Sequence, residues 1–252
     1  MLSKLETKIL LISVLLLLPI TGGLTAYTIL QVQDSKQFSN RINGYVEPRL
    51  LGREISWVQE SLVVVKCDES SGSGFSFGLD AFDIERGFKF KSEGSSDSSI
   101  IITNSHVVKN CSGSNIRIIV ADKSSHFARI IDVDLENDLA LLTTAVEIPP
   151  LFASISTPFE GFWVMALGSP HGLAGSVTFG NVINRDSKQI FSTASLSPGN
   201  SGGPLIDNEG YVFGVNTGAK PVGQNFNISV GINALCYKLI TCPSEKFWQE
   251  EE

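Results

Sequence analysis

Short apolar runs separated by turn-forming residues make up most of the chain beyond its first 50 residues. Residues 61–66, 100–102 and 139–142 are rich in Val, Ile and Leu, and each run predicts a strand. Gly, Pro, Ser and Asn recur between such runs at regular spacing, as they do between the strands of barrels. The pattern predicts an all-β architecture of antiparallel strands, followed by a short helix over residues 234–240.

An uncharged, apolar stretch occupies the N-terminus. No charged residue occurs from Ile9 to Gln33, residues 10–18 are strongly apolar, and lysines precede them. These are the properties of a membrane-targeting segment. The sequence therefore predicts a cytoplasmic N-terminus over residues 1–8 and a membrane-targeting helix over residues 9–30.

Two fates of this targeting helix stay open. Pro19 and the small residues 21–23 favour cleavage of a signal peptide, after which the protein would be secreted. The apolar residues 24–30 favour retention, because the whole uncharged run can span a hydrocarbon core of about 30 Å. We favour a single-pass signal anchor with its lysines inside, which puts the rest of the exported chain on the periplasmic or another extracytoplasmic face.

Polar and proline-containing segments divide the rest of the chain. Residues 31–50 are polar and predict a tether or N-terminal arm, and the Pro- and Ser/Thr-rich residues 149–158 separate two halves of a folded region. With 252 residues and 42% hydrophobic content, the chain is long enough for a sizeable core in one domain of two barrels. The expected boundaries are residues 51–240 for the domain, about 55–145 and about 160–233 for the barrels, and 241–252 for a C-terminal tail.

A serine among glycines is the first candidate for chemistry. Residues 199–205 read Gly-Asn-Ser-Gly-Gly-Pro-Leu, so backbone N–H groups can surround whatever Ser201 attacks. A serine hydroxyl is a poor nucleophile at neutral pH, so it needs a base to take its proton and an acid to orient that base. His106 supplies a base, and Asp138, which precedes the apolar residues 139–142, supplies an acid.

The order of these residues distinguishes between hydrolase folds. The motif Gly-x-Ser-x-Gly around Ser201 also fits the nucleophile elbow of lipases and esterases, in which the histidine follows the serine. All three histidines, His106, His126 and His171, precede Ser201. An α/β-hydrolase would therefore lack its base. The candidate catalytic residues occur along this chain in the order histidine, aspartate, serine.

Each candidate has a structural alternative. A glycine-rich turn with a serine is a common hairpin connection, and a histidine next to an apolar run can be a core residue. Asp132 and Asp134 compete with Asp138, but they lie in a segment that alternates as a solvent-facing strand does. Asp138 is preferred because a buried strand follows it, where an acid needs a partner. His126 and His171 are expected on the surface or in loops.

The three motifs together resemble the chymotrypsin-like serine proteases, and most closely the HtrA branch of that family. Residues 72–77, which read Gly-Ser-Gly-Phe-Ser-Phe, and residues 161–170 and 177–182 are also similar to HtrA segments, so the resemblance covers roughly residues 58–235. It implies two six-stranded antiparallel β-barrels with the catalytic residues in the cleft between them. It also implies a serine endopeptidase that hydrolyses exported or misfolded polypeptides through an acyl-enzyme.

The same resemblance implies further site residues. The oxyanion hole corresponds to Gly199, Asn200 and Ser201, with the N–H groups of Gly199 and Ser201 as donors. Ser195 corresponds to the base of the primary specificity pocket. The strand that pairs with the substrate backbone corresponds to Asn216, Thr217 and Gly218. Because this lining carries no acid, we expect cleavage after small or medium apolar residues.

An insertion departs from the HtrA pattern. Between Phe77 and Ile100 that family has a short hairpin, whereas this chain has charged and Ser/Gly-rich residues over positions 78–99. Such a composition cannot bury a core, so the sequence predicts a mobile surface loop here. The loop either has no function or rims the site.

The cysteines fit an exported protein. Cys67, Cys111, Cys236 and Cys242 allow three pairings if all are oxidised. Chymotrypsin relatives have a bridge near the histidine, and this resemblance favours Cys67 with Cys111, although HtrA proteins generally lack it. Cys236 and Cys242 can pair only if the terminal helix breaks, because six residues put them on different faces. Buried free thiols are the alternative.

The composition of the chain argues against some classes of binding partner and cofactor. The formal net charge of −7 argues against nucleic acid, and no His/Cys cluster has metal-ligand spacing, so neither metal nor organic cofactor is expected. The expected partners are polypeptide substrates and, through the N-terminal segment, the membrane. The resemblance also implies a homotrimer held by aromatic residues of the arm, Phe38 and Tyr45.

Many HtrA proteins carry a PDZ domain after the protease, and none is expected here because the chain ends at Glu252.

Two alternatives to an active peptidase stay open. The first alternative is a latent or inactive HtrA-like scaffold, in which the motifs persist but the oxyanion loop is collapsed. The second alternative is a chaperone-like peptide-binding module. The presence of all three catalytic motifs argues against it, because binding alone does not need a base next to a serine hydroxyl.

Overall fold

The computed structural model describes residues 44–68, 70–85, 87–91, 99–111, 116–154, 158–170, 173–219 and 226–242, all within the unit Gly44–Glu252. The expected cytoplasmic N-terminus, the membrane-targeting helix and most of the expected tether therefore lie outside the described residues. Among the helices in the described ranges, none has the length and apolarity needed to cross a membrane.

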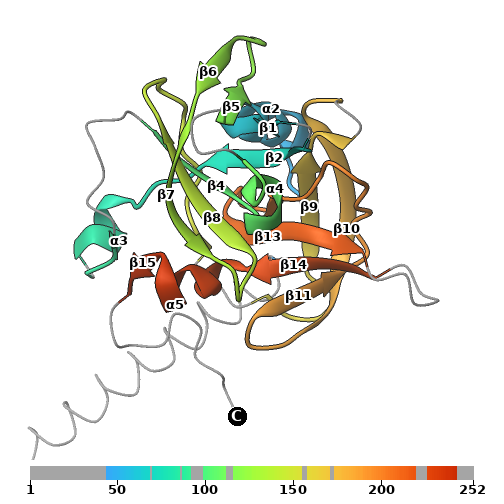
Figure 1. Ribbon diagram of the computed structural model, residues 1–252. Coiled ribbons are helices and arrows are strands. Elements are labelled where there is room, and N and C mark those ends of the chain that lie inside the picture. Colours follow the sequence, from blue (N-terminus) through green and yellow to red (C-terminus); the bar gives the residue numbers. More distant parts are fainter. Residues whose placement is uncertain are drawn as a thin grey trace, which may run out of the picture. The chain divides into compact units, whose positions relative to one another are not determined.

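The first half of the folded region is one antiparallel sheet of seven strands, the first sheet (Figure 1). Its strands are rich in Val and Ile, which favour extended backbone and pack well on a pleated surface. The strand order is β6-β5-β1-β2-β4-β8-β7, so β2 lies at the centre. The bounds are β1 Leu62–Cys67, β2 Ser70–Ser76, β4 Ser99–Thr103, β5 Ile116–Ile119, β6 Ser125–Phe127, β7 Arg129–Asp134 and β8 Leu139–Thr144.

The second half is a closed barrel of six antiparallel strands in the order β10-β11-β14-β13-β12-β9. Every residue of β9 and of β14 is buried, whereas β10 is partly exposed along most of its length. The barrel therefore has an inner side that packs within the protein and a side that meets solvent. The bounds are β9 Trp163–Gly168, β10 Ser176–Arg185, β11 Gln189–Ser192, β12 Pro204–Ile206, β13 Val212–Ala219 and β14 Asn227–Gly231.

The expectation of two closed six-stranded barrels is wrong for the first half. β6 and β7 are the two edges of the first sheet and do not pair with each other. Only Ala128 separates these strands, so the chain has no turn there that could bring them side by side. The first half is therefore an open half-barrel, and closure is confirmed for the second half only.

One apolar cluster joins the two halves. Phe75, Ile102 and Leu139 of the first sheet belong to the same buried cluster as Leu167 and Val215 of the barrel. Burial of apolar surface stabilises a fold by about 25 cal/mol per Å². This shared core holds β2, β4 and β8 against β9 and β13, whose ends carry the candidate site residues.

Helix α2 (Leu51–Ser61) leads directly into β1. Leu51, Ile55 and Val58 recur at helical spacing and pack in the shared core. Gln59 Nε2 donates a hydrogen bond of 2.7 Å to Gly175 O. The helix therefore also holds the loop that precedes β10.

The insertion over residues 78–99 is partly folded, which corrects the expectation of a surface loop. It contains helix α3 (Ala81–Glu85) and strand β3 (Lys89–Phe90). Strand β3 pairs with β15 (Ile240–Thr241) near the C-terminus. Residues 92–98, which hold the Ser/Gly-rich part, lie outside the described residues.

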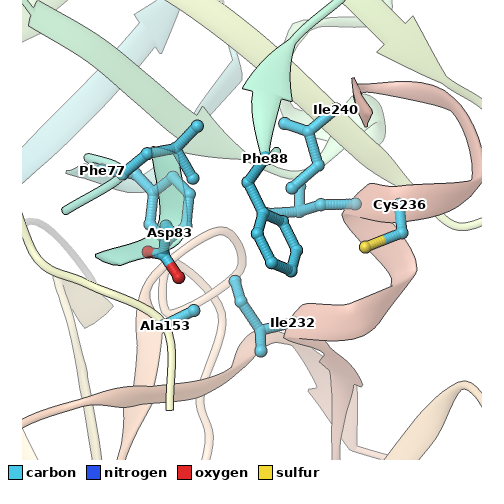
Figure 2. A pocket seen from close by; sticks show the side chains of 9 residues that line it. Phe77, Asp83, Phe88, Ala153, Ile232, Cys236 and Ile240 are labelled. Atoms are coloured by element: carbon cyan, nitrogen blue, oxygen red, sulfur yellow. The ribbon is translucent and has the colours of Figure 1, made fainter. Parts of the chain in front are cut away.

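Phe88 anchors this insertion. Figure 2 shows its ring among apolar side chains of both halves, and the residue is only 2% exposed. The space left between these side chains is about 10 Å³, which is too small for more than one water molecule. The composition of the insertion did not predict this contact. A segment rich in Ser and Gly can still dock on the core, because a single aromatic side chain buries a large apolar area.

Two disulfides pair the four cysteines. Cys67 is bonded to Cys111, with Cα atoms 5.3 Å apart, which is the pairing that the resemblance favoured. Cys236 is bonded to Cys242, with Cα atoms 5.4 Å apart. The expected C-terminal helix breaks between these two residues, because it consists only of η2 (Ile232–Ala234) and α5 (Leu235–Lys238) before β15 begins.

Candidate active site

His106 lies in the short helix α4 (Ser105–Val108), directly after β4. Val107 and Val108 are buried in the core of the first sheet, whereas the His106 side chain is 48% exposed. Its Nδ1 lies 2.7 Å from Asp138 Oδ2. Because a carboxylate only accepts hydrogen bonds, Nδ1 carries the proton, and Nε2 keeps a lone pair with which it can act as a base.

Asp138 lies in the turn between β7 and β8, with a positive φ of 54°. Its Oδ1 accepts hydrogen bonds from the Ser105 hydroxyl and the His106 backbone N–H, at 2.8 and 3.0 Å. Its Oδ2 accepts from His106 Nδ1 and from the Thr217 hydroxyl, both at 2.7 Å. The Asn104 amide also donates to the Asp138 carbonyl oxygen at 2.8 Å. Both the carboxylate and the backbone of this acid are therefore held in place.

His106 and Asp138 change each other's affinity for protons. The hydrogen bond with Asp138 raises the pKa of His106 above its usual value, against an opposing effect of burial. Burial acts to raise the pKa of Asp138, but hydrogen bonds from His106 and Thr217 outweigh it and hold that pKa below its usual value. Asp138 is therefore ionised at neutral pH and can stabilise the imidazolium that forms when His106 accepts a proton.

Glycines shape the loop between β11 and β12 that carries Ser201. Gly199 and Gly202 have φ values of +103° and +88°, which favour glycine because a Cβ would clash with the backbone. A Cβ on Gly202 would also collide with the Ser73 carbonyl and the Thr103 hydroxyl of the first sheet. The loop thus approaches the first sheet more closely than any side chain at Gly202 would allow.

The Ser201 hydroxyl donates a hydrogen bond of 3.0 Å to Thr217 O. Within the described ranges it makes no hydrogen bond to His106. Catalytic hydrogen bonds of this kind often form only when substrate is bound. The Ser201 hydroxyl therefore has to rotate toward His106 before it can transfer its proton.

Two of the three residues assigned to the oxyanion hole offer a free donor. Across the described part of the chain, the backbone N–H groups of Gly199 and Ser201 donate to no protein acceptor. The Asn200 N–H, in contrast, donates to Ser197 O at 3.0 Å. The N–H of Asn200 is therefore already used within the loop, unlike the N–H groups of the other two residues.

The residues assigned to substrate binding separate into buried and open positions. Asn216 is fully buried, and its Nδ2 donates to the carbonyl oxygens of Leu167 and Pro204 at 3.1 and 2.9 Å. Its side chain therefore links β9, β12 and β13 inside the barrel. Ser195 is exposed, and a Cβ added to Gly218 would meet nothing within 4 Å, so open space adjoins both residues.

Thr217 has a side-chain contact that the motifs did not indicate. Its hydroxyl donates to Asp138 Oδ2 and so links the barrel to the acid of the first sheet. The pairing of β13 with β14 shifts between Asn216 and Gly218, which leaves Thr217 in a β-bulge, and such a bulge can turn a side chain away from the regular alternation of the strand. The hydroxyl of Ser105, which donates to Asp138 Oδ1, was also missed.

The rival candidates make local contacts. Nε2 of His126 lies 2.7 Å from the Ser124 hydroxyl beside the edge strand β6, and His171 lies outside the described residues. Asp134 accepts hydrogen bonds from the N–H groups of Glu136 and Asn137 in its own turn. In the part of the chain that the structure describes, no group of three or more His, Cys, Asp or Glu side chains could hold a metal ion.

Comparison with known sequences identifies a family and several relatives. The sequence pattern of the family described as "Trypsin-like peptidase domain" matches residues 85–215. The mitochondrial serine protease HTRA2 of Drosophila willistoni is 35% identical over 145 residues, and that of Drosophila grimshawi is 36% identical over 146 residues. These stretches cover 52% of this chain and 33% and 34% of the two relatives, so the chain spans about a third of the length of the curated relatives it matches.

Two solved structures share the fold. The serine endoprotease from Yersinia pestis superposes with a TM-score of 0.61 at 24% identity, over 76% of this chain and 65% of that chain. The Rv3671c protease, solved in an inactive form, superposes with a TM-score of 0.60 at 21% identity, over 77% of this chain and 96% of that chain. At these identities the structures support the fold.

The fold and the site together define a chymotrypsin-like architecture with a candidate serine-hydrolase centre. The match over more than half of the sequence shows that this chain belongs to the trypsin-like peptidase family. Within that family it is similar to the HtrA2 serine proteases, which confirms the resemblance drawn from the motifs.

Proposed function

We propose that this chain is a serine endopeptidase in which Ser201 is the nucleophile, His106 the base and Asp138 the acid that orients it. The proposal is carried by one chain of hydrogen bonds. His106 is bonded to Asp138, the Thr217 hydroxyl donates to the same carboxylate, and the Thr217 carbonyl oxygen accepts a hydrogen bond from the Ser201 hydroxyl. The backbone N–H groups of Gly199 and Ser201, which donate to no acceptor among the described residues, lie in the same loop as the hydroxyl.

The chemistry follows from these groups. Ser201 Oγ attacks the carbonyl carbon of the substrate while His106 Nε2 takes the hydroxyl proton. The carbonyl oxygen gains negative charge, which the N–H groups of Gly199 and Ser201 stabilise. His106 then protonates the leaving amine, and water hydrolyses the acyl-enzyme by the same steps. Asp138 stays ionised throughout and holds the imidazole in one tautomer.

Substrate binding is proposed to align the nucleophile. Thr217 O accepts the Ser201 hydroxyl, and Thr217 belongs to the strand assigned to pairing with the substrate backbone. A substrate N–H that bonds to Thr217 O would displace the Ser201 hydroxyl. The hydroxyl then becomes free to turn toward His106, which couples occupancy of the cleft to formation of the reactive arrangement.

Exported or misfolded polypeptides with small or medium apolar residues before the cleaved bond are the proposed substrates. Support comes from Ser195 and Gly218, which carry no charge and lie next to solvent or open space. A peptide library digested by the protein should be cleaved after Ala, Val or Leu. Preferential cleavage after Arg or Lys would contradict this specificity.

Digestion of casein by the full chain in detergent tests the peptidase proposal. Ser201→Ala should lower the rate by about 10⁶-fold, to below detection, because it removes the nucleophile. A serine-reactive phosphonate should label the unchanged protein and not this variant. Ser187→Ala, at an exposed serine of the barrel, is the matched control and should keep full activity. A folded protein that neither cleaves nor reacts would instead support the latent scaffold.

A further inference from the structure

The Ser73 hydroxyl connects the first sheet to the loop that carries the nucleophile. Ser73 lies on β2 and is fully buried. Its Oγ donates to Gly199 O at 2.6 Å and accepts a hydrogen bond of 2.8 Å from the Ser169 N–H. Both partners belong to the barrel half, so one side chain of the first sheet holds the backbone of two loops in the other half.

The backbone of Ser73 holds the same loop. Its N–H donates to Ser201 O at 2.8 Å, and its own carbonyl oxygen accepts the Thr103 hydroxyl at 2.7 Å. The carbonyl groups of Gly199 and Ser201 are thus bound by the hydroxyl and the N–H of a single residue. Thr103, which is also fully buried, fixes that residue from the side of the first sheet.

Gly199 needs such an external partner. It has a φ of +103°, and glycine moves between backbone conformations at little cost in energy. The hydrogen bond to its carbonyl oxygen therefore selects one orientation of the peptide group that follows it. Gly199 and Ser201 are also the two residues whose free N–H groups are the proposed oxyanion donors. Each bound carbonyl oxygen belongs to the peptide group that follows its residue, whereas the donor N–H belongs to the peptide group that precedes it. Ser73 therefore fixes the backbone directly beside each donor.

We propose that Ser73 is a positioning residue for the oxyanion hole: its hydroxyl and N–H hold the loop so that the N–H groups of Gly199 and Ser201 meet the developing negative charge. This inference rests on the proposed peptidase function. Because the oxyanion exists only from the transition state onward, loss of the Ser73 hydroxyl lowers kcat and leaves KM near its original value.

The test compares Ser73→Ala with Ser76→Ala in the full chain. Ser76 lies on the same strand, is 1% exposed, and donates its hydroxyl to Ile148 O at 3.0 Å, so it matches Ser73 in burial and in donating to a backbone carbonyl oxygen, but its acceptor lies outside the nucleophile loop. Both variants should lose thermal stability, and Ser73→Ala should lose more, because it also leaves the Ser169 N–H without its acceptor. At a temperature where both are folded, only Ser73→Ala should lower kcat, by about 10- to 100-fold.

A second readout isolates the transition state. A peptide aldehyde forms a tetrahedral adduct with the nucleophile that carries an oxygen in the oxyanion position. Its inhibition constant should rise in Ser73→Ala by the same factor as kcat falls, and it should not change in Ser76→Ala. Ser73→Thr, which keeps a hydroxyl, should recover activity relative to Ser73→Ala.

Equal kcat values in Ser73→Ala and Ser76→Ala would overturn the inference. If Ser73→Ala does not fold, Thr103→Val provides the test, because it keeps the volume while removing the hydroxyl that holds Ser73 O. It should lower kcat at constant KM, and a kcat equal to that of the unchanged protein would count against the role of Ser73. If the unchanged protein neither cleaves nor reacts with the phosphonate, the peptidase proposal itself fails, and this inference falls with it.

Discussion

Asp207 shows how strongly its surroundings act on a single residue of this protein. It follows β12, and its Oδ1 accepts hydrogen bonds from the N–H groups of Glu209 and Tyr211 at 2.9 and 2.8 Å. Burial raises the pKa of Asp207 to about 7, because an apolar environment disfavours the charged carboxylate. The hydrogen bonds act in the opposite direction and offset this effect only in part.

The shift at Asp207 links stability to pH. Between about pH 4 and pH 7 the folded protein keeps a proton that the unfolded chain has released. The stabilisation from this carboxyl group is fully present below its unfolded pKa and is lost as the pH rises through the folded pKa. Asp207 therefore makes the folded state less stable at alkaline than at acidic pH.

Asp207→Asn should remove this pH dependence. The amide keeps an acceptor for the turn but carries no charge, so the free energy of unfolding at pH 8 should rise by up to about 4 kcal/mol. Little difference is expected at pH 4. Urea unfolding at both values measures the effect. Asp186→Asn is the matched control, because Asp186 caps two N–H groups of an exposed turn in the same way. An equal gain in both variants would argue against burial as the cause.

At the scale of elements, the insertion is held by the buried Phe88, by Phe90, whose ring packs edge-on against Phe77, and by a short strand pair. Helix α3 contributes an exposed Ile84 (61%), while Phe88, just before β3, is buried in the shared core. Strand β3 then pairs with β15, which the Cys236–Cys242 disulfide holds close to α5. The insertion and the C-terminal segment therefore stabilise each other.

Phe88→Ala should destabilise the protein by about 3–5 kcal/mol, the usual cost of emptying a buried aromatic position. Ile84→Ala in the same insertion should change the free energy of unfolding by less than about 0.5 kcal/mol, because that side chain meets solvent. Urea unfolding of both variants provides the measurement. If the insertion were a surface loop, as its composition suggested, the two substitutions would have equally small effects.

At the scale of the whole molecule, activity depends on the contact between the two halves. The acid and base lie on the first sheet, whereas the nucleophile lies on the barrel. Thr217 reaches across to Asp138, and Ser73 reaches across to Gly199 and Ser201. Gly202 permits this contact, because there is no room for a side chain between the nucleophile loop and β2.

Gly202→Ala should therefore damage stability and activity together. The new Cβ would meet the Ser73 carbonyl, and the positive φ would add strain, so we expect a loss of more than about 1 kcal/mol and a large fall in cleavage of peptides. Gly52→Ala is the control, because its Cβ would meet nothing within 4 Å. It should be neutral or slightly stabilising. Retention of full activity in Gly202→Ala would show that the halves can separate locally without harm.

Some elements could be predicted because their signals are local. The apolar runs at residues 61–66, 100–102 and 139–142 correspond to β1, β4 and β8 within one residue or two. The sequence did not predict helix α2, because Leu51, Ile55 and Val58 form only a short apolar stripe, which is a weak periodic signal in a helix of 11 residues.

The amino-acid sequence by itself determined the kinds of strands, the order of His106, Asp138 and Ser201, and the glycines that allow the nucleophile loop its conformation. These properties depend on side-chain chemistry and on neighbours a few residues away. Only the tertiary structure decided that the first sheet stays open, that Asn216 is buried, and which backbone donors remain free. Such outcomes depend on hydrogen bonds between groups far apart along the chain, as between Ser73 and Gly199, which are separated by 126 positions. No local pattern encodes the partners of such bonds, because packing of the two halves brings them together.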